Sequence, residues 1–211
     1  MKTIIVAGIG TDVGKTIVSA ILVEALEADY WKPIQAGNLE NTDTNVVSKL
    51  TSNQKSIFHP EAYQLKTPAS PHAAAKIDNV EIHLDKIQIP ITKNNLIIEL
   101  AGGLMVPLNN KQLNIDLIKK WNASVILVSH NYLGSINHTL LSIEVLKNNN
   151  LKLLGLIFNG EENKSTQNFI LQYTKIPCIG YIHQLSELDK VTIKKQADNL
   201  KKESQFNTLL L

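Results

Sequence analysis

The sequence contains no arginine: all 21 of its basic residues are lysine. Many enzymes that transfer phosphoryl groups use an arginine to stabilise the charge of the transition state. Neither this chain nor a homodimer of it can supply such an arginine. That role could fall only to a lysine, a metal ion or backbone amides.

Cysteine and long apolar runs are also scarce. The single cysteine, Cys178, excludes a disulfide within the chain and is typical of a reducing compartment. No apolar run approaches the roughly 20 residues that span a bilayer, and the first residues do not resemble a signal peptide. The formal net charge of +2 is too small to indicate nucleic acid or an anionic membrane as a partner. We therefore expect a cytoplasmic protein with neither of these partners.

The length of 211 residues, with 44% hydrophobic and 19% charged residues, predicts a single globular domain over residues 1–211. Apolar segments of strand length alternate with segments of helical periodicity. This alternation predicts an α/β fold with a parallel sheet that is covered by helices on both faces. The predicted strands are 3–7, 30–34, 96–100, 124–129, 151–158 and 177–182, and the predicted helices are 17–28, 41–50, 78–90, 115–121, 136–148 and 165–173.

Two segments fall outside this alternation. Residues 51–76 are irregular and include three prolines, which indicates a long excursion over the surface. Residues 188–211 carry several lysines beside regularly spaced apolar residues, and we predict an amphipathic helix on the protein surface there.

A glycine-rich segment, Gly8-Ile9-Gly10-Thr11-Asp12-Val13-Gly14-Lys15-Thr16, joins the first predicted strand to a helix. A loop in this setting binds phosphate, because its backbone N–H groups and the helix N-terminus converge on the anion. Gly14 suits the backbone angles of such a loop, Lys15 would reach the outer phosphates, and the Thr16 hydroxyl would bind Mg²⁺. The usual pattern has glycine where Ile9 stands, so this loop is one residue longer.

Lys32, Asp43 and Glu99 lie at predicted junctions between a strand and a loop, which converge on one crevice of a parallel sheet. Glu99 ends an apolar strand, where an unpaired carboxylate is costly to bury. Mg²⁺ prefers oxygen ligands, so we expect Thr16 and one or two of these carboxylates to hold it. The structural alternatives are an ion pair of Glu99 with Lys15 or Lys32, and a helix cap at Asp43.

Six blocks occur in a fixed order along nearly the whole chain. They are residues 8–16, Lys32-Pro33-Ile34-Gln35-Ala36-Gly37, Thr67-Pro68-Ala69-Ser70-Pro71-His72, Glu99 with Ala101-Gly102-Gly103, Leu133-Gly134-Ser135-Ile136-Asn137-His138, and Asn159-Gly160. Together they resemble the dethiobiotin synthetase family, in which the longer phosphate loop is itself a trait. The resemblance implies a three-layer P-loop NTPase fold with a mainly parallel central sheet flanked by helices, and a homodimer.

The resemblance further implies a cyclo-ligase of biotin biosynthesis that uses ATP and Mg²⁺. Its other substrates are 7,8-diaminononanoate and CO₂. One amine of the diamine takes up CO₂ as a carbamate, whose oxygen attacks the γ-phosphate of ATP. The second amine then attacks the mixed anhydride, which closes the cyclic urea of dethiobiotin and releases phosphate.

The same resemblance implies roles for the matched residues. Catalytic roles fall to Lys15, Lys32 and Thr11, and Mg²⁺ ligation to Thr16, Asp43 and Glu99. The nucleotide would contact Asp12, Val13, Gly14, Lys15, Thr16 and Ile17, with Asn159 on the adenine edge. The substrate would contact Lys32 and, through its carboxylate, the helix start at Gly134, Ser135, Ile136 and Asn137.

Two places depart from the family pattern. Ala36 stands where the family usually has Ser or Thr, so Thr42, Thr44 or a water would have to supply that hydroxyl. The adenine segment is changed at residues 180–183. The family's carboxylate-binding tyrosine has no clear counterpart, and Asn168 or Phe169 lies near its place.

The main alternative is a partitioning or division-site ATPase, which acts as a nucleotide switch by binding partners. Such proteins have a second lysine five residues before the loop lysine, and that place is Gly10 here. A corrin-synthetase domain of the amidotransferase type is a further alternative, but the chain has no glutaminase half. The sequence therefore favours the synthetase.

Overall fold

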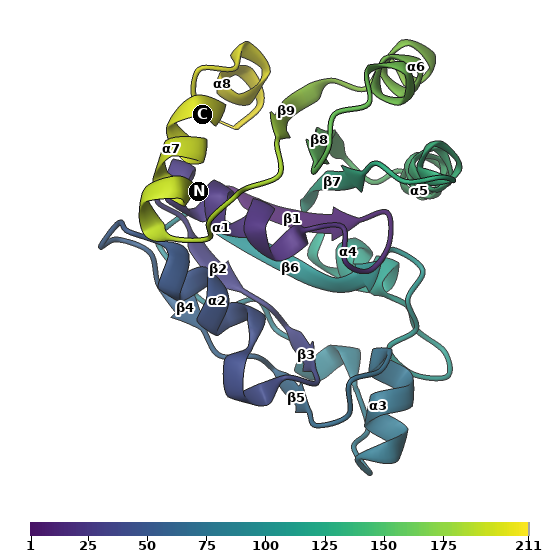
Figure 1. Ribbon diagram of the computed structural model, residues 1–211. Coiled ribbons are helices and arrows are strands. Elements are labelled where there is room, and N and C mark those ends of the chain that lie inside the picture. The colour runs from purple at the N-terminus through teal and green to yellow at the C-terminus, as the bar shows by residue number, and fades with distance from the viewer. Residues whose placement is uncertain (211) are drawn as a thin grey trace.

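The computed structural model describes residues 1–210, and Leu211, the last residue of the predicted C-terminal segment, lies outside them. A seven-stranded sheet with the order β4-β2-β6-β1-β7-β8-β9 forms the centre, and its neighbouring strands run parallel (Figure 1). Its strands are β1 (Thr3–Gly8), β2 (Asp29–Trp31), β4 (Phe58–His59), β6 (Leu96–Gly103), β7 (Ser124–His130), β8 (Leu153–Asn159) and β9 (Cys178–Ile182). A second, two-stranded sheet pairs β3 (Ile34–Ala36) with β5 (Tyr63–Leu65).

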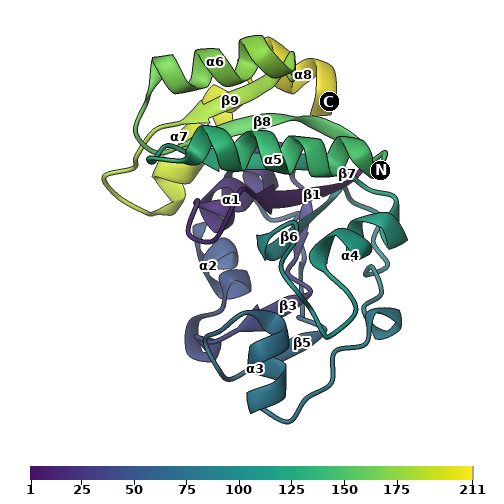
Figure 2. The ribbon, with the colours of Figure 1, turned by 90° about the vertical axis from the view of Figure 1, so that its right-hand side faces the viewer.

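Helices cover both faces of the large sheet (Figures 1 and 2). On one face, α1 (Lys15–Leu26) packs against α2 (Asp43–Leu50) and α7 (Lys190–Leu200), and α8 (Ser204–Leu210) packs on β9. On the other face lie α4 (Asn114–Trp121), α5 (Ser135–Asn148) and α6 (Lys164–Thr174). A short helix, α3 (Pro71–Ile77), packs against the small sheet. The predicted three-layer α/β fold is confirmed.

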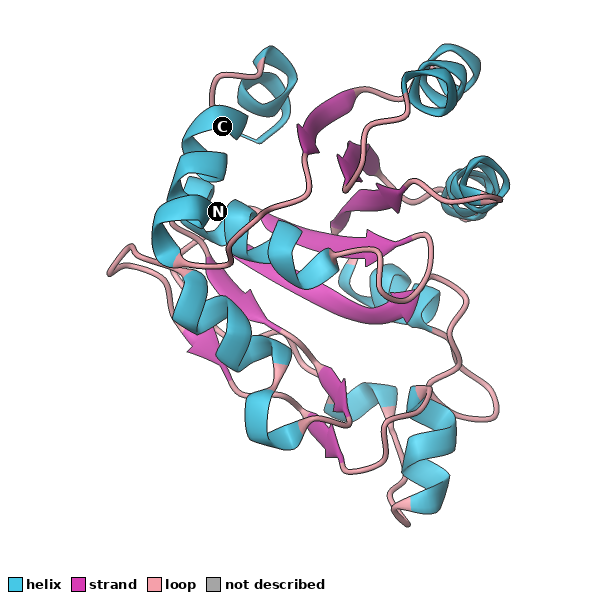
Figure 3. Cartoon of the chain, viewed as in Figure 1, coloured by secondary structure: helices cyan, strands magenta, loops and turns pink. Residues whose placement is uncertain are grey.

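The central strands are the most deeply buried part of the molecule. Residues 4–7 of β1, 97 and 98 of β6 and 125–128 of β7 are almost all Ile, Val, Leu or Ala and are at most 1% exposed. Such unbroken apolar runs arise because a parallel sheet with helices on both faces has no solvent side. Figure 3 shows β1 and β6 side by side with both arrowheads at the same edge, where the loops that follow them meet.

The predicted strand 30–34 is wrong in one respect, because the chain breaks it into two strands of different sheets. Pro33 has no N–H to offer a sheet, and its carbonyl accepts hydrogen bonds from the N–H groups of Ala62 and Tyr63, at 2.9 and 3.0 Å. The chain therefore leaves β2 after Trp31 and pairs with β5 as β3. Lys32 lies at this break.

The prediction for residues 51–90 also needs correction. The segment 51–76 contains β4, β5 and most of α3, and the predicted helix 78–90 is only one 3₁₀ turn, Leu84–Lys86. Asp78 does not begin a helix, because its carboxylate accepts hydrogen bonds from the backbone and hydroxyl of Thr67. Asn79 has a left-handed φ of 55°, which ends α3.

The C-terminal segment forms two helices and not one. The apolar face of α7 is buried, with Ile193 and Ala197 at 0% exposure, because it packs on α1. Within residues 1–210, no helix is both long and apolar enough to cross a membrane.

Asp29, at the start of β2, ties the edge of the large sheet to two loops. Its buried carboxylate accepts hydrogen bonds from Thr92 Oγ1 at 2.6 Å, Asn94 Nδ2 at 2.9 Å and the Ile57 N–H at 2.9 Å, and lies 3.1 Å from His59 Nε2. Burial alone would raise the pKa of Asp29, but these hydrogen bonds outweigh it, so the pKa lies below its ordinary value.

Asp29→Ala should lower the free energy of unfolding by about 3 kcal/mol at pH 7, because it leaves several buried donors without an acceptor. Urea denaturation would measure it, with the exposed Asp85→Ala as a control that should change little. The folded pKa of Asp29 is below the unfolded one, so its stabilisation is present above about pH 4 and is lost as the pH falls through the folded pKa. An Asp29→Ala deficit that stayed constant at acidic pH would contradict this account.

Candidate functional site

The glycine-rich loop leaves β1 at Gly8 and enters α1 at Lys15, as predicted. Gly14 caps the helix with a left-handed φ of 87° and without a side-chain hydrogen bond. The Lys15 ammonium folds back onto the loop and donates to the Gly10 carbonyl at 3.0 Å. Burial lowers the pKa of Lys15, and the neighbouring Lys32 lowers it further against the attraction of Glu99. The loop therefore turns into α1 at Gly14, and the Lys15 ammonium lies against the loop carbonyl of Gly10.

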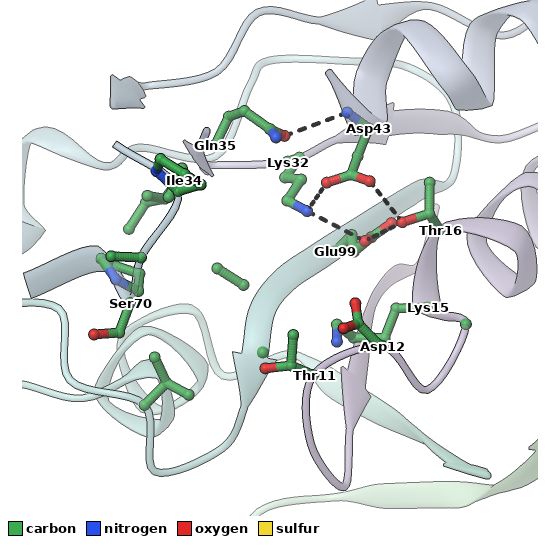
Figure 4. A pocket seen from close by; sticks show the side chains of 18 of the residues that line it. Thr11, Asp12, Lys15, Thr16, Lys32, Ile34, Gln35, Asp43, Ser70 and Glu99 are labelled. Carbon is green, nitrogen blue, oxygen red and sulfur yellow. Dashed lines mark hydrogen bonds and ion pairs between the residues drawn. The ribbon is translucent and has the colours of Figure 1, made fainter. Parts of the chain in front are cut away.

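Two carboxylates from different elements converge on the first turn of α1. Thr16 Oγ1 lies 2.8 Å from Asp43 Oδ1 and 2.9 Å from Glu99 Oε1 (Figure 4). A threonine hydroxyl has a single hydrogen to donate, so it cannot satisfy both carboxylates at once. The Thr16 hydroxyl and the two carboxylates thus bring three oxygens together, and such a donor set fits a hard cation such as Mg²⁺. Among the described residues no group of three or more His, Cys, Asp or Glu could hold a metal ion.

Lys32 supplies the positive charge between these carboxylates. Its ammonium contacts Asp43 Oδ2 and lies 3.4 Å from Glu99 Oε1 (Figure 4). Burial would lower the pKa of Lys32, but attraction to Glu99 and Asp43 outweighs it and raises the pKa. The pKa of Asp43 is lowered, because its attraction to Lys32 outweighs the effect of burial. The ion pair of Glu99 with Lys32, expected as one alternative, is thus present.

The other alternative, that Asp43 serves only as a helix cap, does not hold. Thr42 is the cap of α2, and its side chain accepts a hydrogen bond from the Asn45 N–H at 3.2 Å. The Asp43 side chain points to Thr16 and Lys32, as Figure 4 shows. The helix start therefore delivers Asp43 to the site.

Two further residues contact the cluster of Thr16, Lys32, Asp43 and Glu99 and were not predicted from the sequence. The fully buried Tyr30 donates its hydroxyl to Glu99 Oε2 at 2.9 Å, and burial together with Glu99 raises the pKa of the phenol well above its ordinary value. The Gln35 side chain accepts from the Asp43 N–H at 3.3 Å and donates to the Gly37 carbonyl at 2.9 Å. Tyr30 stands two residues before Lys32 in an extended segment, and that spacing puts both side chains on one side of the chain.

A cleft of about 720 Å³ opens beside this cluster. It brings together most of the predicted catalytic, nucleotide and metal residues, namely Thr11, Asp12, Gly14, Lys15, Thr16, Ile17, Lys32, Asp43 and Glu99. Ala36 also lines it, and so does Ser70, which Figure 4 labels. The Ser70 hydroxyl lies 3.0 Å from His72 Nδ1. Val13 is buried behind the loop.

The predicted adenine contact lies in an adjoining cavity of about 430 Å³, which shares Ile17 with the cleft. Asn159 Nδ2 donates to the Val13 carbonyl at 3.0 Å, which leaves Oδ1 and a second N–H of the amide. The Asn159 carbonyl lies 2.8 Å from His130 Nδ1. A hydrogen-bonding amide is thus fixed directly behind the phosphate loop.

The predicted substrate residues at the start of α5 do not line the cleft of their own chain. Gly134, Ser135 and Ile136 line a third cavity, of about 400 Å³. Asn137 faces a groove between α5 and α6. Gly134 caps α5 with a φ of 105° and no side-chain hydrogen bond.

Comparison with known proteins identifies the family. A family model described as an AAA domain matches residues 2–192. The chain is 51% identical to the ATP-dependent dethiobiotin synthetase BioD of Christiangramia forsetii, over 95% of this chain and 97% of that protein. The chain belongs to the ATP-dependent dethiobiotin synthetase family. A second synthetase of this family, from Chlamydia pneumoniae, is 49% identical over 95% of this chain and 90% of its own length.

The solved structures with a similar fold include members of the alternative class, the partitioning and division-site ATPases. A ParA family ATPase from Chlorobium tepidum has a TM-score of 0.55 at 10% sequence identity, over 99% of this chain and 96% of that one. At that identity the likeness shows the fold alone. The synthetase relatives cover nearly the whole chain at about half identity, so the predicted family is confirmed over the switch ATPase.

Gly14→Ala should weaken binding of a fluorescent ATP analogue by about tenfold or more, because alanine is strained at this φ and its Cβ would collide with Asn159. Equilibrium fluorescence titration would measure the loss. The matched control is Gly10→Ala in the same loop, since a Cβ there meets nothing within 4 Å. Equal effects of the two substitutions would contradict the assigned role of Gly14.

Proposed function

We propose that this chain carboxylates 7,8-diaminononanoate with CO₂ and closes the ring to dethiobiotin at the expense of ATP. The family supports the overall reaction. The observation that carries the proposal is the cleft, where a phosphate-type loop, two lysines and an oxygen cluster face one space. These are the groups that an arginine-free site needs to hold a triphosphate and a second anion together.

We assign the triphosphate to the loop and the α1 N-terminus. The N–H groups of residues 12–17 would bind the phosphate oxygens, and Lys15 would leave the Gly10 carbonyl for the outer phosphates. Asn159 would read the base, since its amide keeps one acceptor and one donor. The pKa of Lys15 is lowered because burial, together with Lys32, outweighs the attraction of Glu99, Asp43 and Asp12, and a bound phosphate would oppose that effect.

We assign Mg²⁺ to Thr16, Asp43 and Glu99. When bound, the ion would offset the negative charge of the phosphates. The carboxylate oxygens that now face Lys32 and Thr16 are the ones available to it. Lys32, released in part from these carboxylates, would then be free to bind a substrate anion.

Lys32 and Thr11 would hold the carbamate that forms when one amine of the diamine takes up CO₂. The carbamate oxygen then attacks the γ-phosphorus and breaks its bond to the bridging oxygen, so that ADP leaves. The second amine attacks the carbonyl carbon of this anhydride, phosphate leaves, and the cyclic urea is complete. Lys15 and Lys32 stabilise the oxygens on which charge accumulates.

The substrate carboxylate is assigned to the start of α5, at residues 134–137. This start lies outside the cleft of its own chain, so we also propose a homodimer in which α5 of one protomer adjoins the cleft of its partner. Exposed apolar side chains on α5 and α6 support this surface: Leu141 is 55%, Phe169 48% and Tyr173 70% exposed. We propose further that residues 1–211 form one domain and act in the cytoplasm.

The wild-type protein should release phosphate from ATP in the presence of Mg²⁺ and bicarbonate only when 7,8-diaminononanoate is added. Lys15→Ala should lower this rate by about 100-fold or more, because it removes the cation nearest the transferred phosphoryl group. Lys152→Ala, at an exposed position outside the cleft, is the matched control and should be unaffected. A wild-type protein whose phosphate release does not depend on the diamine would refute the proposed reaction.

The proposed dimer predicts a second result. Tyr173→Glu should shift the protein from dimer to monomer in sedimentation velocity, because it buries a charge in the apolar surface of α5 and α6. Val191→Glu on α7, a residue that is 75% exposed on the opposite face, should leave the dimer intact. A wild-type monomer at micromolar concentration would exclude the dimer.

A further inference from the structure

Tyr30 donates a hydrogen bond to a carboxylate of the site, and no proposed step uses it. It lies in β2, beside the strand β6 that carries Glu99, and it is 0% exposed. Its hydroxyl donates to Glu99 Oε2 at 2.9 Å. The phenol does not line the cleft, so it cannot touch a ligand there.

The two oxygens of Glu99 therefore have different surroundings. Oε1 lies 2.9 Å from Thr16 Oγ1 and 3.4 Å from Lys32 Nζ, on the side of the cleft. Oε2 accepts the phenol of Tyr30 on the side of the core. Both oxygens of the carboxylate thus have hydrogen-bond partners, and rotation about the Cγ–Cδ bond of Glu99 would break the hydrogen bond to Tyr30.

We infer that Tyr30 is a positioning residue that fixes Glu99 so that Oε1 alone is presented to the metal ion. This inference rests on the assignment of Mg²⁺ in the proposed function. Glu99 would then bind the metal ion through one oxygen only. This role also accounts for the hydrogen bond from the buried Tyr30 hydroxyl to the Glu99 carboxylate. Partners that orient ligating carboxylates typically contribute 10- to 100-fold to metal affinity.

A purely structural role for the phenol makes a different prediction. If Tyr30 only supplied a hydrogen bond to a buried carboxylate, its loss would lower the free energy of unfolding and leave the metal site of the folded protein unchanged. Metal affinity in the folded protein therefore separates the two roles, whereas stability does not.

The test measures how much Mn²⁺ strengthens the binding of a fluorescent non-hydrolysable ATP analogue. Tyr30→Phe keeps the ring and removes only the hydroxyl. We expect it to reduce this enhancement by about tenfold and to leave binding without metal unchanged. The matched control is Tyr63→Phe, because Tyr63 also uses its hydroxyl in one hydrogen bond, from the His83 N–H at 3.0 Å, away from the cleft.

A double-mutant cycle identifies the route of the effect. In a Glu99→Gln background, Tyr30→Phe should cause little further loss of the Mn²⁺ enhancement, because Tyr30 acts only through Glu99. Additive losses would overturn the inference, as would an enhancement in Tyr30→Phe within about twofold of wild type. No enhancement in the wild-type protein would instead refute the metal assignment itself, while the phosphate-release assay tests the reaction separately.

A measurement on the wild-type chain covers the case in which Tyr30→Phe does not fold. In protein labelled with ¹³C at tyrosine Cζ, the Tyr30 resonance should move when Mg²⁺ joins the bound analogue, and the Tyr63 resonance should not. A Tyr30 resonance that is insensitive to Mg²⁺ would overturn the inference.

Discussion

The site depends on a single constraint, which is that Glu99 carries a negative charge into the middle of the central sheet. Its side chain is 1% exposed, and a carboxylate at such a depth is tolerated only when it is paired and hydrogen-bonded. Thr16, Lys32 and Tyr30 supply those contacts. All three come from segments connected to the strands that flank β6. Thr16 lies in the helix that follows β1, Tyr30 lies in β2, and Lys32 directly follows β2.

The two lysines of the cleft differ in their electrostatic surroundings. Lys32 has two carboxylates as neighbours, and its pKa is raised. Lys15 has a carbonyl as its hydrogen-bond partner, and its pKa is lowered by burial. An incoming anion therefore gains most at Lys15, whose charge is the less compensated of the two. Lys32, by contrast, contacts the carboxylates of Asp43 and Glu99.

The fold is shared with a ParA family ATPase, so the fold by itself does not define the activity. What distinguishes this chain lies within a few residues of the sheet edge. Gly10 stands where the switch proteins have a lysine. The break after β2 places Lys32 and the residues of β3 in the lining of the cleft. In the proposed function, the part of the cleft beside Lys32 holds the second substrate.

The sequence by itself determined the alternation of strands and helices, the phosphate loop and the presence of Lys32, Asp43 and Glu99 at one sheet edge. Those features follow from local periodicity and from the rule that parallel strands end on the same side. The tertiary structure alone decided the break at Pro33, the loss of the helix at 78–90 and the hydrogen bond from Tyr30 to Glu99. Each of these depends on hydrogen bonds between different segments, which local periodicity does not reveal. The partner of Tyr30, for example, lies 69 residues further along the chain.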